Sequence, residues 1–131
     1  AAKAAGATFG VSPGATPRLI EACAEQELPL LAGAATASEI MALLEAGYTA
    51  MKFFPAEQSG GAAFLKAMAS PLPLAGFCPT GGISLKNARD YLSLPNILCV
   101  GGSWVAPKDA MARCDLAAIT ALAAEAAGLK G

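Results

Sequence analysis

One lysine within an apolar run is the residue most suited to covalent chemistry. The run spans residues 50–57, AMKFFPAE, and predicts a buried strand because it is short, aromatic and interrupted by a proline. Side chains alternate across a strand, so Lys52 and Phe54 face one side while Met51 and Phe53 face the other. Desolvation lowers the pKa of a buried amine, and a neutral amine attacks carbonyl carbon. Lys52 is the candidate catalytic nucleophile; the alternative is a lysine that reaches water past apolar surface.

Two glycine pairs follow apolar runs further along the chain. The first stands in CPTGGIS, residues 78–84, and the second in VGGSW, residues 100–104. Glycine lets backbone N–H groups approach an anion closely, and in barrels of alternating strands and helices the loops after the last two strands often bind phosphate. A tight turn is the alternative for each pair. Two pairs at the same end of consecutive strands, and at the same end as Lys52, favour a phosphate site.

Other residues near these motifs each have two interpretations. Pro13, in VSPG at residues 11–14, lines a pocket or simply forms a turn. Phe54 packs against whatever binds Lys52, or is an ordinary core aromatic. Glu57 is a proton shuttle, or a solvated or capping residue. Trp104 and Tyr48 serve a subunit contact or the core.

The elements that must position these residues alternate along the chain. Strands are predicted at residues 8–11, 29–32, 49–54, 76–78 and 97–100. Helices are predicted from Thr16 with Pro17 at the first position, from a Thr36–Glu39 capping box to Gly47, and over residues 59–69, from 84 and over 115–127. Mostly apolar strands that alternate with helices predict a parallel sheet covered by helices, either a closed barrel or a doubly wound sheet. Residues 1–6 resemble a helix end capped by Gly6, so the chain is expected to begin within a fold.

Composition narrows the class of protein. The chain has 131 residues, of which 55% are hydrophobic and 15% charged, which suits one globular domain. Its net charge is -1, without a basic tract, so nucleic acid and anionic membranes are not expected partners. The four cysteines are widely spaced and histidine is absent, which argues against zinc and favours reduced thiols in the cytoplasm. Neither a membrane-spanning run nor a signal peptide is predicted.

These motifs together carry a family resemblance. Residues 52–57, the stretch FCPTGGI at 77–83 and GGSW at 101–104 closely resemble 2-keto-3-deoxy-6-phosphogluconate (KDPG) aldolase, which also acts as 4-hydroxy-2-oxoglutarate aldolase. The resemblance runs over essentially the whole chain. It implies an α/β (βα)8 TIM barrel, a homo-trimer, and a class I mechanism without metal or cofactor. It also implies cleavage of KDPG to pyruvate and glyceraldehyde 3-phosphate in the Entner–Doudoroff pathway.

The resemblance assigns expected roles residue by residue. Lys52 looks like the Schiff-base lysine, Thr80 would contact the substrate carboxylate or its hydroxyl region, and Phe54 and Pro13 would wall the pyruvate pocket. The phosphate would be held by Gly81, Gly82, Gly102 and Ser103.

The chain departs from the family in length. It supplies about the last five βα units, so residues 1–131 are expected to form a single, partial βα-barrel domain. The family's glutamate base and substrate arginine would lie in the missing N-terminal part, and no residue here replaces them by motif. Rival interpretations are a non-catalytic phosphosugar-binding half-barrel, an assembly fragment with idle active-site residues, and a related phosphogalactonate aldolase, against which residues 78–83 argue.

Overall fold

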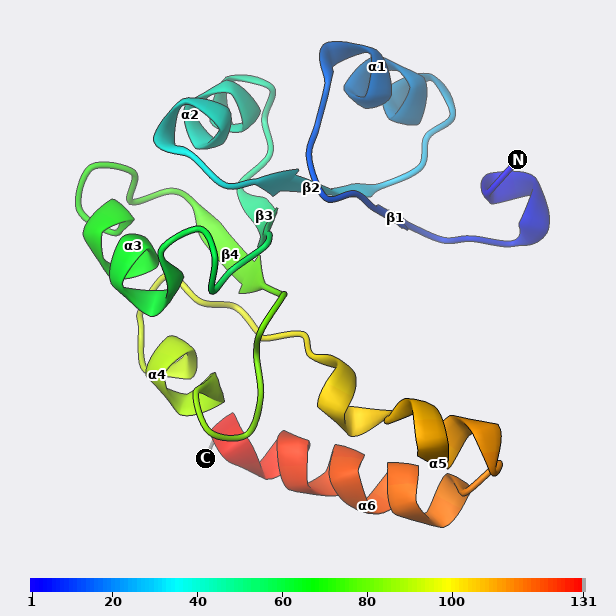
Figure 1. Ribbon diagram of the computed structural model, residues 1–131. Helices are drawn as coiled ribbons and strands as arrows, with labels where there is room; N and C mark the ends of the chain where they lie inside the picture. The colour runs from blue at the N-terminus through cyan, green and yellow to red at the C-terminus, as the bar shows by residue number, and fades with distance from the viewer. Residues whose placement is uncertain (131) are drawn as a thin grey trace.

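The computed structural model describes residues 1–130 and shows an α/β chain built on a parallel sheet (Figure 1). The strands are β1 (Gly10–Val11), β2 (Leu30–Ala34), β3 (Ala50–Phe53) and β4 (Gly76–Pro79). The α-helices are α1 (Pro17–Glu25), α2 (Ala37–Glu45), α3 (Gly61–Met68), α4 (Ala88–Leu92), α5 (Lys108–Ala112) and α6 (Leu116–Ala127). Short 3₁₀ helices are η1 (Lys3–Ala5), η2 (Ser103–Val105) and η3 (Gly128–Lys130).

The strands pair in chain order, β1-β2-β3-β4, and every pair is parallel. A parallel pair requires a crossover connection, and α1, α2 and α3 provide these crossovers. Figure 1 shows α1 to α4 on one side of the curved sheet. The arrangement confirms the predicted parallel α/β fold, here as a partial barrel.

Side-chain caps start α1 and α2 where the sequence predicts them. The Thr16 hydroxyl accepts a hydrogen bond from the backbone N–H of Leu19, and Pro17 opens α1. In α2, Thr36 accepts from the N–H of Glu39 at 3.3 Å, and the Glu39 carboxylate accepts from the N–H of Thr36 at 2.9 Å. These contacts confirm the predicted first helix start and the capping box, because both depend only on local sequence.

The capping box gives a pH-dependent prediction. The Ala35 N–H, which donates to the Glu39 carboxylate at 2.8 Å, lowers the pKa of Glu39; partial burial opposes this and the bonds with Thr36 add to it. A carboxyl whose pKa is lower in the folded state stabilises the fold above its unfolded pKa, and this stability is lost as the pH falls through the folded pKa. Because Glu39 is exposed, we expect Glu39→Ala to cost less than about 1 kcal/mol at pH 7.

Urea denaturation at pH 7 and pH 3 measures this effect. The difference between wild type and Glu39→Ala should be smaller at pH 3, because the stability that comes from the lowered pKa of Glu39 declines as the pH falls. Glu21→Ala, at an exposed position of α1, is the control and should show little change at either pH. An equal difference for Glu39→Ala at both values would contradict the assigned hydrogen bonds.

The prediction of a fifth strand at residues 97–100 is wrong. Residues 97–101 form no continuous ladder with β4; two isolated bridges join Phe77 to Ile97, and Thr80, just after β4, to Gly101. The offset between partners grows by one residue from the first bridge to the second, as in a β-bulge. In addition, Pro79 has no N–H to donate to the ladder. The segment nevertheless lies beside β4, where the sequence places it.

Two predicted helix starts need correction, and one helix was missed. Turns precede α3, which begins at Gly61 rather than Ser59. Helix α4 begins at Ala88, because Asn87 Oδ1 accepts from the N–H of Ser84 at 2.8 Å and folds the residues between them into a turn. Helix α5 was not predicted; it is short, and its N-terminus has no side-chain cap.

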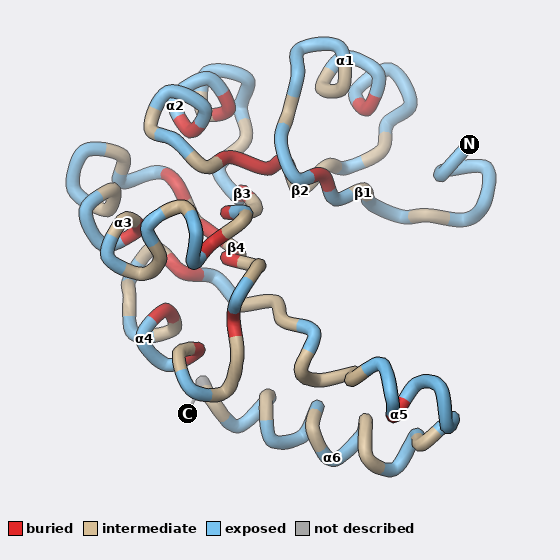
Figure 2. Tube along the Cα trace, viewed as in Figure 1, coloured by how far each residue is buried: buried red, intermediate tan, exposed pale blue. Residues whose placement is uncertain are grey.

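The hydrophobic core lies between the sheet and helices α2, α3 and α4, and Figure 2 shows buried residues concentrated along the strands. Phe53 is its aromatic centre. Its ring stacks on that of Phe64 with centroids 5.3 Å apart and meets that of Phe77 edge-on at 6.4 Å. The core therefore fixes strand β3 from the helix-covered side of the sheet.

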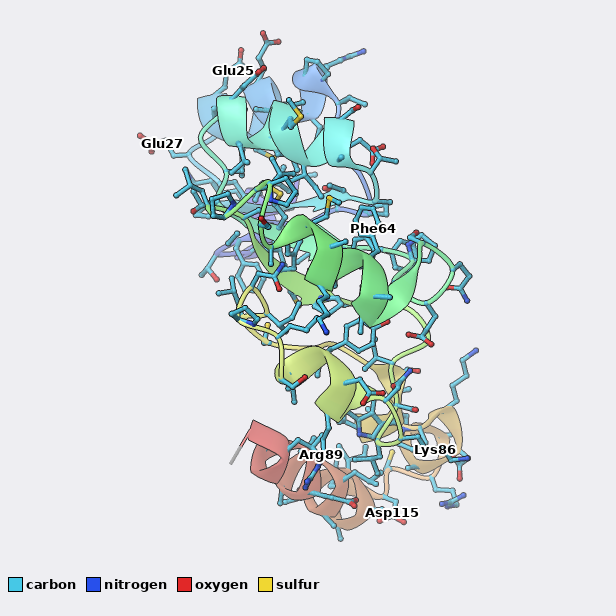
Figure 3. The ribbon with its side chains drawn as sticks, turned by 90° about the vertical axis from the view of Figure 1, so that its left-hand side faces the viewer. Glu25, Glu27, Phe64, Lys86, Arg89 and Asp115 are labelled. Atoms are coloured by element: carbon cyan, nitrogen blue, oxygen red, sulfur yellow. The ribbon has the colours of Figure 1, made fainter. Side chains whose placement is uncertain are left out.

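The outer surface carries the charged side chains. Figure 3 shows Glu25 at the end of α1 and Glu27 just after it, with Lys86 before α4 and Arg89 on α4. Within residues 1–130, the helices are too short or too polar to cross a membrane.

Candidate active site

Lys52 occupies the centre of the sheet, near the carboxyl end of β3. It pairs in register with Gly33 of β2 and with Cys78 of β4. Met51 and Phe53, its neighbours in sequence, are fully buried in the helix-covered core. Because side chains alternate along a strand, Lys52 projects from the opposite face, as predicted. Its side chain is half-buried there, between the desolvated lysine and the water-exposed lysine that the sequence left open.

The nearest aromatic partner of Lys52 is Phe54. The Lys52 Nζ lies 4.7 Å from the centroid of the Phe54 ring, within the range of a cation–π contact. This contact aims the amine along the ring face and limits the rotamers of a long side chain. Phe54 is partly exposed, so the ring forms a wall of the site and does not belong to the core.

A cavity of about 410 Å³ opens in front of Lys52. Its lining residues are Lys52, Phe54, Thr80, Gly81, Gly82, Ile83, Gly101, Gly102 and Ser103. All but one of the predicted site residues are in this set, and they come from three segments that are far apart in sequence. The segments meet because the carboxyl ends of parallel strands lie at one edge of the sheet.

Pro13 is the predicted site residue that does not line the cavity. It is exposed and follows β1. A Cβ built on Gly33 would lie 2.2 Å from the Pro13 carbonyl carbon, so the loop after β1 rests directly on Gly33. Since Gly33 pairs with Lys52, Pro13 lies one strand away from the cavity.

Both glycine pairs are shaped by close packing. Gly81 and Gly82 have φ values of +96° and +81°, a region that side chains disfavour. A Cβ on Gly102 would lie 1.8 Å from the Trp104 ring, so the ring occupies the space that any side chain would need. Within residues 1–130, the N–H groups of Gly81, Gly82 and Gly102 donate no backbone hydrogen bond. These donors border the cavity and suit an anion.

Thr80 adds a polar group between the lysine and the glycines. Its Oγ1 is buried and has no hydrogen-bond partner among the described residues. Buried hydroxyls are normally hydrogen-bonded, so this hydroxyl is a candidate contact for a bound oxyanion or hydroxyl.

Sequence reasoning missed some of the residues around the amine. Ile83 and Gly101 line the cavity without having been predicted to do so. Cys78, interpreted from sequence as a core thiol, is only half-buried and shares the sheet face of Lys52. The register between β3 and β4 reveals this neighbour, and register is not readable from either strand alone.

The environment of Cys78 makes its reactivity testable. Burial raises the pKa of the Cys78 thiol to about 12, the hydrogen bond and charge of Cys99 add to the shift, and Lys52 opposes it. Only the thiolate is alkylated readily. At pH 8 we expect iodoacetamide to modify exposed Cys114 at least about tenfold faster than Cys78. Peptide mapping measures both rates, and the two should converge in urea. Equal rates in the folded protein would contradict a half-buried thiol with a raised pKa at Cys78.

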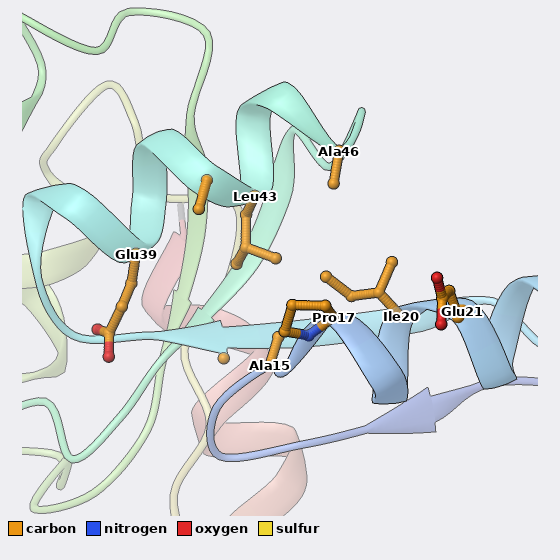
Figure 4. A pocket seen from close by; sticks show the side chains of 9 residues that line it. Ala15, Pro17, Ile20, Glu21, Glu39, Leu43 and Ala46 are labelled. Atoms are coloured by element: carbon orange, nitrogen blue, oxygen red, sulfur yellow. The ribbon is translucent and has the colours of Figure 1, made fainter.

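A second cavity, of about 320 Å³, lies between α1 and α2 (Figure 4). Pro17, Ile20 and Leu43 contribute apolar side chains to it, and the carboxylates of Glu21 and Glu39 stand at its border. It contains no lysine, cysteine or hydroxyl side chain among the described residues that line it. We therefore place the candidate active site at Lys52.

Fold and cavity together define a βα-barrel type of protein with a lysine at the carboxyl edge of its sheet. The family model for KDPG and KHG aldolase matches residues 1–122. The chain belongs to the KDPG and KHG aldolase family.

Individual relatives agree with this assignment. The 2-dehydro-3-deoxy-phosphogluconate aldolase of Dickeya dadantii is 54% identical over 123 residues, covering 94% of this chain and 58% of the relative. The KHG/KDPG aldolase of Escherichia coli K12 is 50% identical over 122 residues, covering 93% and 57%. The chain thus spans less than two thirds of the length of these relatives.

Solved structures show the same architecture. The KDPG aldolase of Legionella pneumophila, with pyruvate captured at low pH as a covalent carbinolamine intermediate, superimposes with a TM-score of 0.91 at 47% identity. The match covers 95% of this chain and 60% of the Legionella chain. The fold is therefore that of the TIM-barrel-type aldolases.

Proposed function

We propose that this chain carries the Schiff-base half of a class I aldolase that cleaves KDPG to pyruvate and glyceraldehyde 3-phosphate. The observation that carries the proposal is the half-buried Lys52, which faces a cavity bordered by two glycine pairs. A nucleophilic amine and a group of anion-binding donors that line one cavity match a substrate that carries both a ketone and a phosphate. The carbinolamine of the Legionella relative supports covalent chemistry of this class.

The reaction starts with the neutral amine of Lys52. It attacks the C2 ketone to give a carbinolamine, and loss of water gives an iminium. The bond between C3 and C4 then breaks, with its electron pair moving toward the iminium nitrogen as the C4 hydroxyl loses its proton. Glyceraldehyde 3-phosphate leaves, and the remaining enamine takes a proton at C3. Water adds to the pyruvate iminium, which releases pyruvate and restores the amine.

The other lining residues position the substrate. Gly81, Gly82, Gly102 and Ser103 would hold the phosphate through backbone and hydroxyl donors, remote from the reacting bond. Thr80, whose hydroxyl has no partner among the described residues, would bind the substrate carboxylate or a hydroxyl. The ring of Phe54 would wall the pyruvate moiety. Pro13 would contribute to the pocket wall indirectly, because its loop packs on Gly33.

Cleavage also needs a general base, whose loss typically costs about 10²- to 10⁴-fold in rate. The cavity has no carboxylate among its lining residues within 1–130. The base and the substrate arginine would come from the segment of the longer relatives that this chain does not span. The chain by itself would then form the Schiff base but turn over slowly.

A second substrate, 4-hydroxy-2-oxoglutarate, is supported by the KHG/KDPG name of the Escherichia coli relative. Its cleavage would give pyruvate and glyoxylate through the same lysine, and needs no phosphate site. A phosphosugar-binding half-barrel without catalysis remains the rival, in which Lys52 only pairs with an anion.

The wider context follows from the same proposal. We place residues 1–131 in one partial βα-barrel domain that works as a homo-trimer in the cytoplasm, without metal or cofactor and without nucleic acid or membrane as partner. The family resemblance supports the trimer, and the near-neutral charge of -1 supports the absence of anionic polymers as partners. Light scattering at several concentrations would test the assembly.

Trapping of the intermediate tests the proposed chemistry. The protein is incubated with pyruvate and borohydride, and its intact mass is measured before peptide mapping. We expect one reduced pyruvate adduct on the peptide that contains Lys52. A folded sample without any adduct would overturn the proposal for this chain, and repeating the experiment with the remaining barrel segment added would show whether that segment is needed to build the pocket.

A further inference from the structure

Glu57 packs directly on the first glycine pair. Its backbone N–H donates to the carbonyl of Gly81 at 3.2 Å, and the N–H of Ala56 donates to the carbonyl of Thr80 at 2.8 Å. A Cβ on Gly82 would lie 2.5 Å from Glu57 Cγ, so the Glu57 methylenes cover the Gly82 backbone. The segment after β3 is thus tied to the loop after β4 at successive residues.

Tyr91 of α4 holds the Glu57 carboxylate from the other side. Its ring is 1% exposed, and its hydroxyl donates a hydrogen bond to Glu57 Oε1. Burial, together with the hydrogen bond and charge of Glu57, raises the pKa of Tyr91. The raised pKa favours the protonated hydroxyl, which is the form that donates to Glu57.

A third segment closes around this contact. A Cβ on Gly61, the first residue of α3, would lie 3.4 Å from the Tyr91 hydroxyl and 3.5 Å from Glu57 Oε1. The N–H of Gly61 donates to the carbonyl of Ala56. The carboxylate is therefore confined between α3, α4 and the glycine loop, although part of Glu57 remains exposed to water.

We propose that Glu57 and Tyr91 are positioning residues that hold the Gly81–Gly82 loop in the shape that binds the substrate phosphate. Glu57 acts through Gly82 and carries a negative charge, so it does not itself bind an anion. Tyr91 fixes the Glu57 side chain, and the Glu57 side chain fixes the loop. The pair should favour phosphorylated substrates and leave the chemistry at Lys52 unchanged; this inference rests on the phosphate site of the proposed function.

Titration with inorganic phosphate, followed by the amide NMR signals of Gly81, Gly82 and Gly102, tests the inference. Wild type should show saturable shifts of these signals. Tyr91→Phe, which removes only the donor, should weaken phosphate binding about tenfold. Glu57→Gln keeps the methylenes and an acceptor for Tyr91, and should bind more tightly than Glu57→Ala. The pyruvate adduct on Lys52 should form with unchanged yield in all of these variants.

Tyr48→Phe is the matched control, because Tyr48 lies in another part of the chain, beside Cys23 and Leu30, and should bind phosphate like wild type. If wild type itself shows no shift, the phosphate site of the proposed function is wrong, and the positioning role fails with it. If wild type binds phosphate and Tyr91→Phe binds equally well, the site stands but the positioning role is overturned. A parallel loss of phosphate binding and of the pyruvate adduct would also overturn it, since that result indicates general disorder of the fold.

Discussion

Replacing Lys52 with alanine is expected to abolish the reduced pyruvate adduct completely. The adduct requires an amine that faces the cavity, and Lys52 is the lysine that lines it. Alanine removes the nucleophile but leaves strand β3 paired on both sides, since the ladder uses backbone groups. Intact mass after incubation with pyruvate and borohydride measures the loss. Lys66→Ala, an exposed substitution on α3, should keep the full adduct yield.

Lys52→Arg separates the two roles proposed for this side chain. Arginine keeps a positive charge but is protonated at any relevant pH, so it cannot attack a ketone. The aldolase interpretation predicts no adduct with Lys52→Arg. In the rival interpretation the charge of Lys52 only pairs with an anion. Inorganic phosphate should then bind Lys52→Arg with the affinity of wild type, and it should bind Lys52→Ala more weakly. An adduct that survives in Lys52→Ala would assign the chemistry to another amine.

The local part of this site was predictable from sequence. The alternation of Met51, Lys52 and Phe53 decides which side chain enters the core, and this alternation depends only on strand geometry. The glycine pairs after Thr80 and Val100 likewise indicate loops where backbone approaches closely. The parallel order of the strands then follows from their alternation with helices, which is why the cavity was expected at one edge of the sheet.

The rest depended on contacts between distant segments. How far Lys52 is buried depends on what covers its face of the sheet, and the residues next to Lys52 in sequence do not indicate this. The partner of Glu57 is Tyr91, 34 residues away, so sequence alone left Glu57 between a proton shuttle and a solvated residue. The failed fifth strand depends on a single extra residue opposite β4, a change of register that apolar pattern does not reveal.

Replacing Phe53 with alanine is expected to cause the largest loss of stability. The Phe53 ring is fully buried, stacked on Phe64 and in edge contact with Phe77. Truncation of a buried phenylalanine typically costs about 3–5 kcal/mol. This is a large share of the free energy of unfolding of a folded domain, which is usually about 5–15 kcal/mol. Urea denaturation followed by circular dichroism measures the free energy of unfolding. Phe9→Ala, at a position 61% exposed, is the control and should cost about 0.5 kcal/mol or less.

The same substitution links the core to the chemistry, because Phe53 and Lys52 are neighbours on opposite faces of β3. The core holds the strand in place through Phe53, and the strand holds the amine at the cavity. The yield of pyruvate adduct in Phe53→Ala should therefore follow the folded fraction as urea is raised, and it should fall at lower urea than in Phe9→Ala. A Phe53→Ala protein as stable as Phe9→Ala would show that the aromatic cluster does not fix β3. Normal stability with a lost adduct would instead show that Phe53 affects the position of Lys52 without affecting the fold.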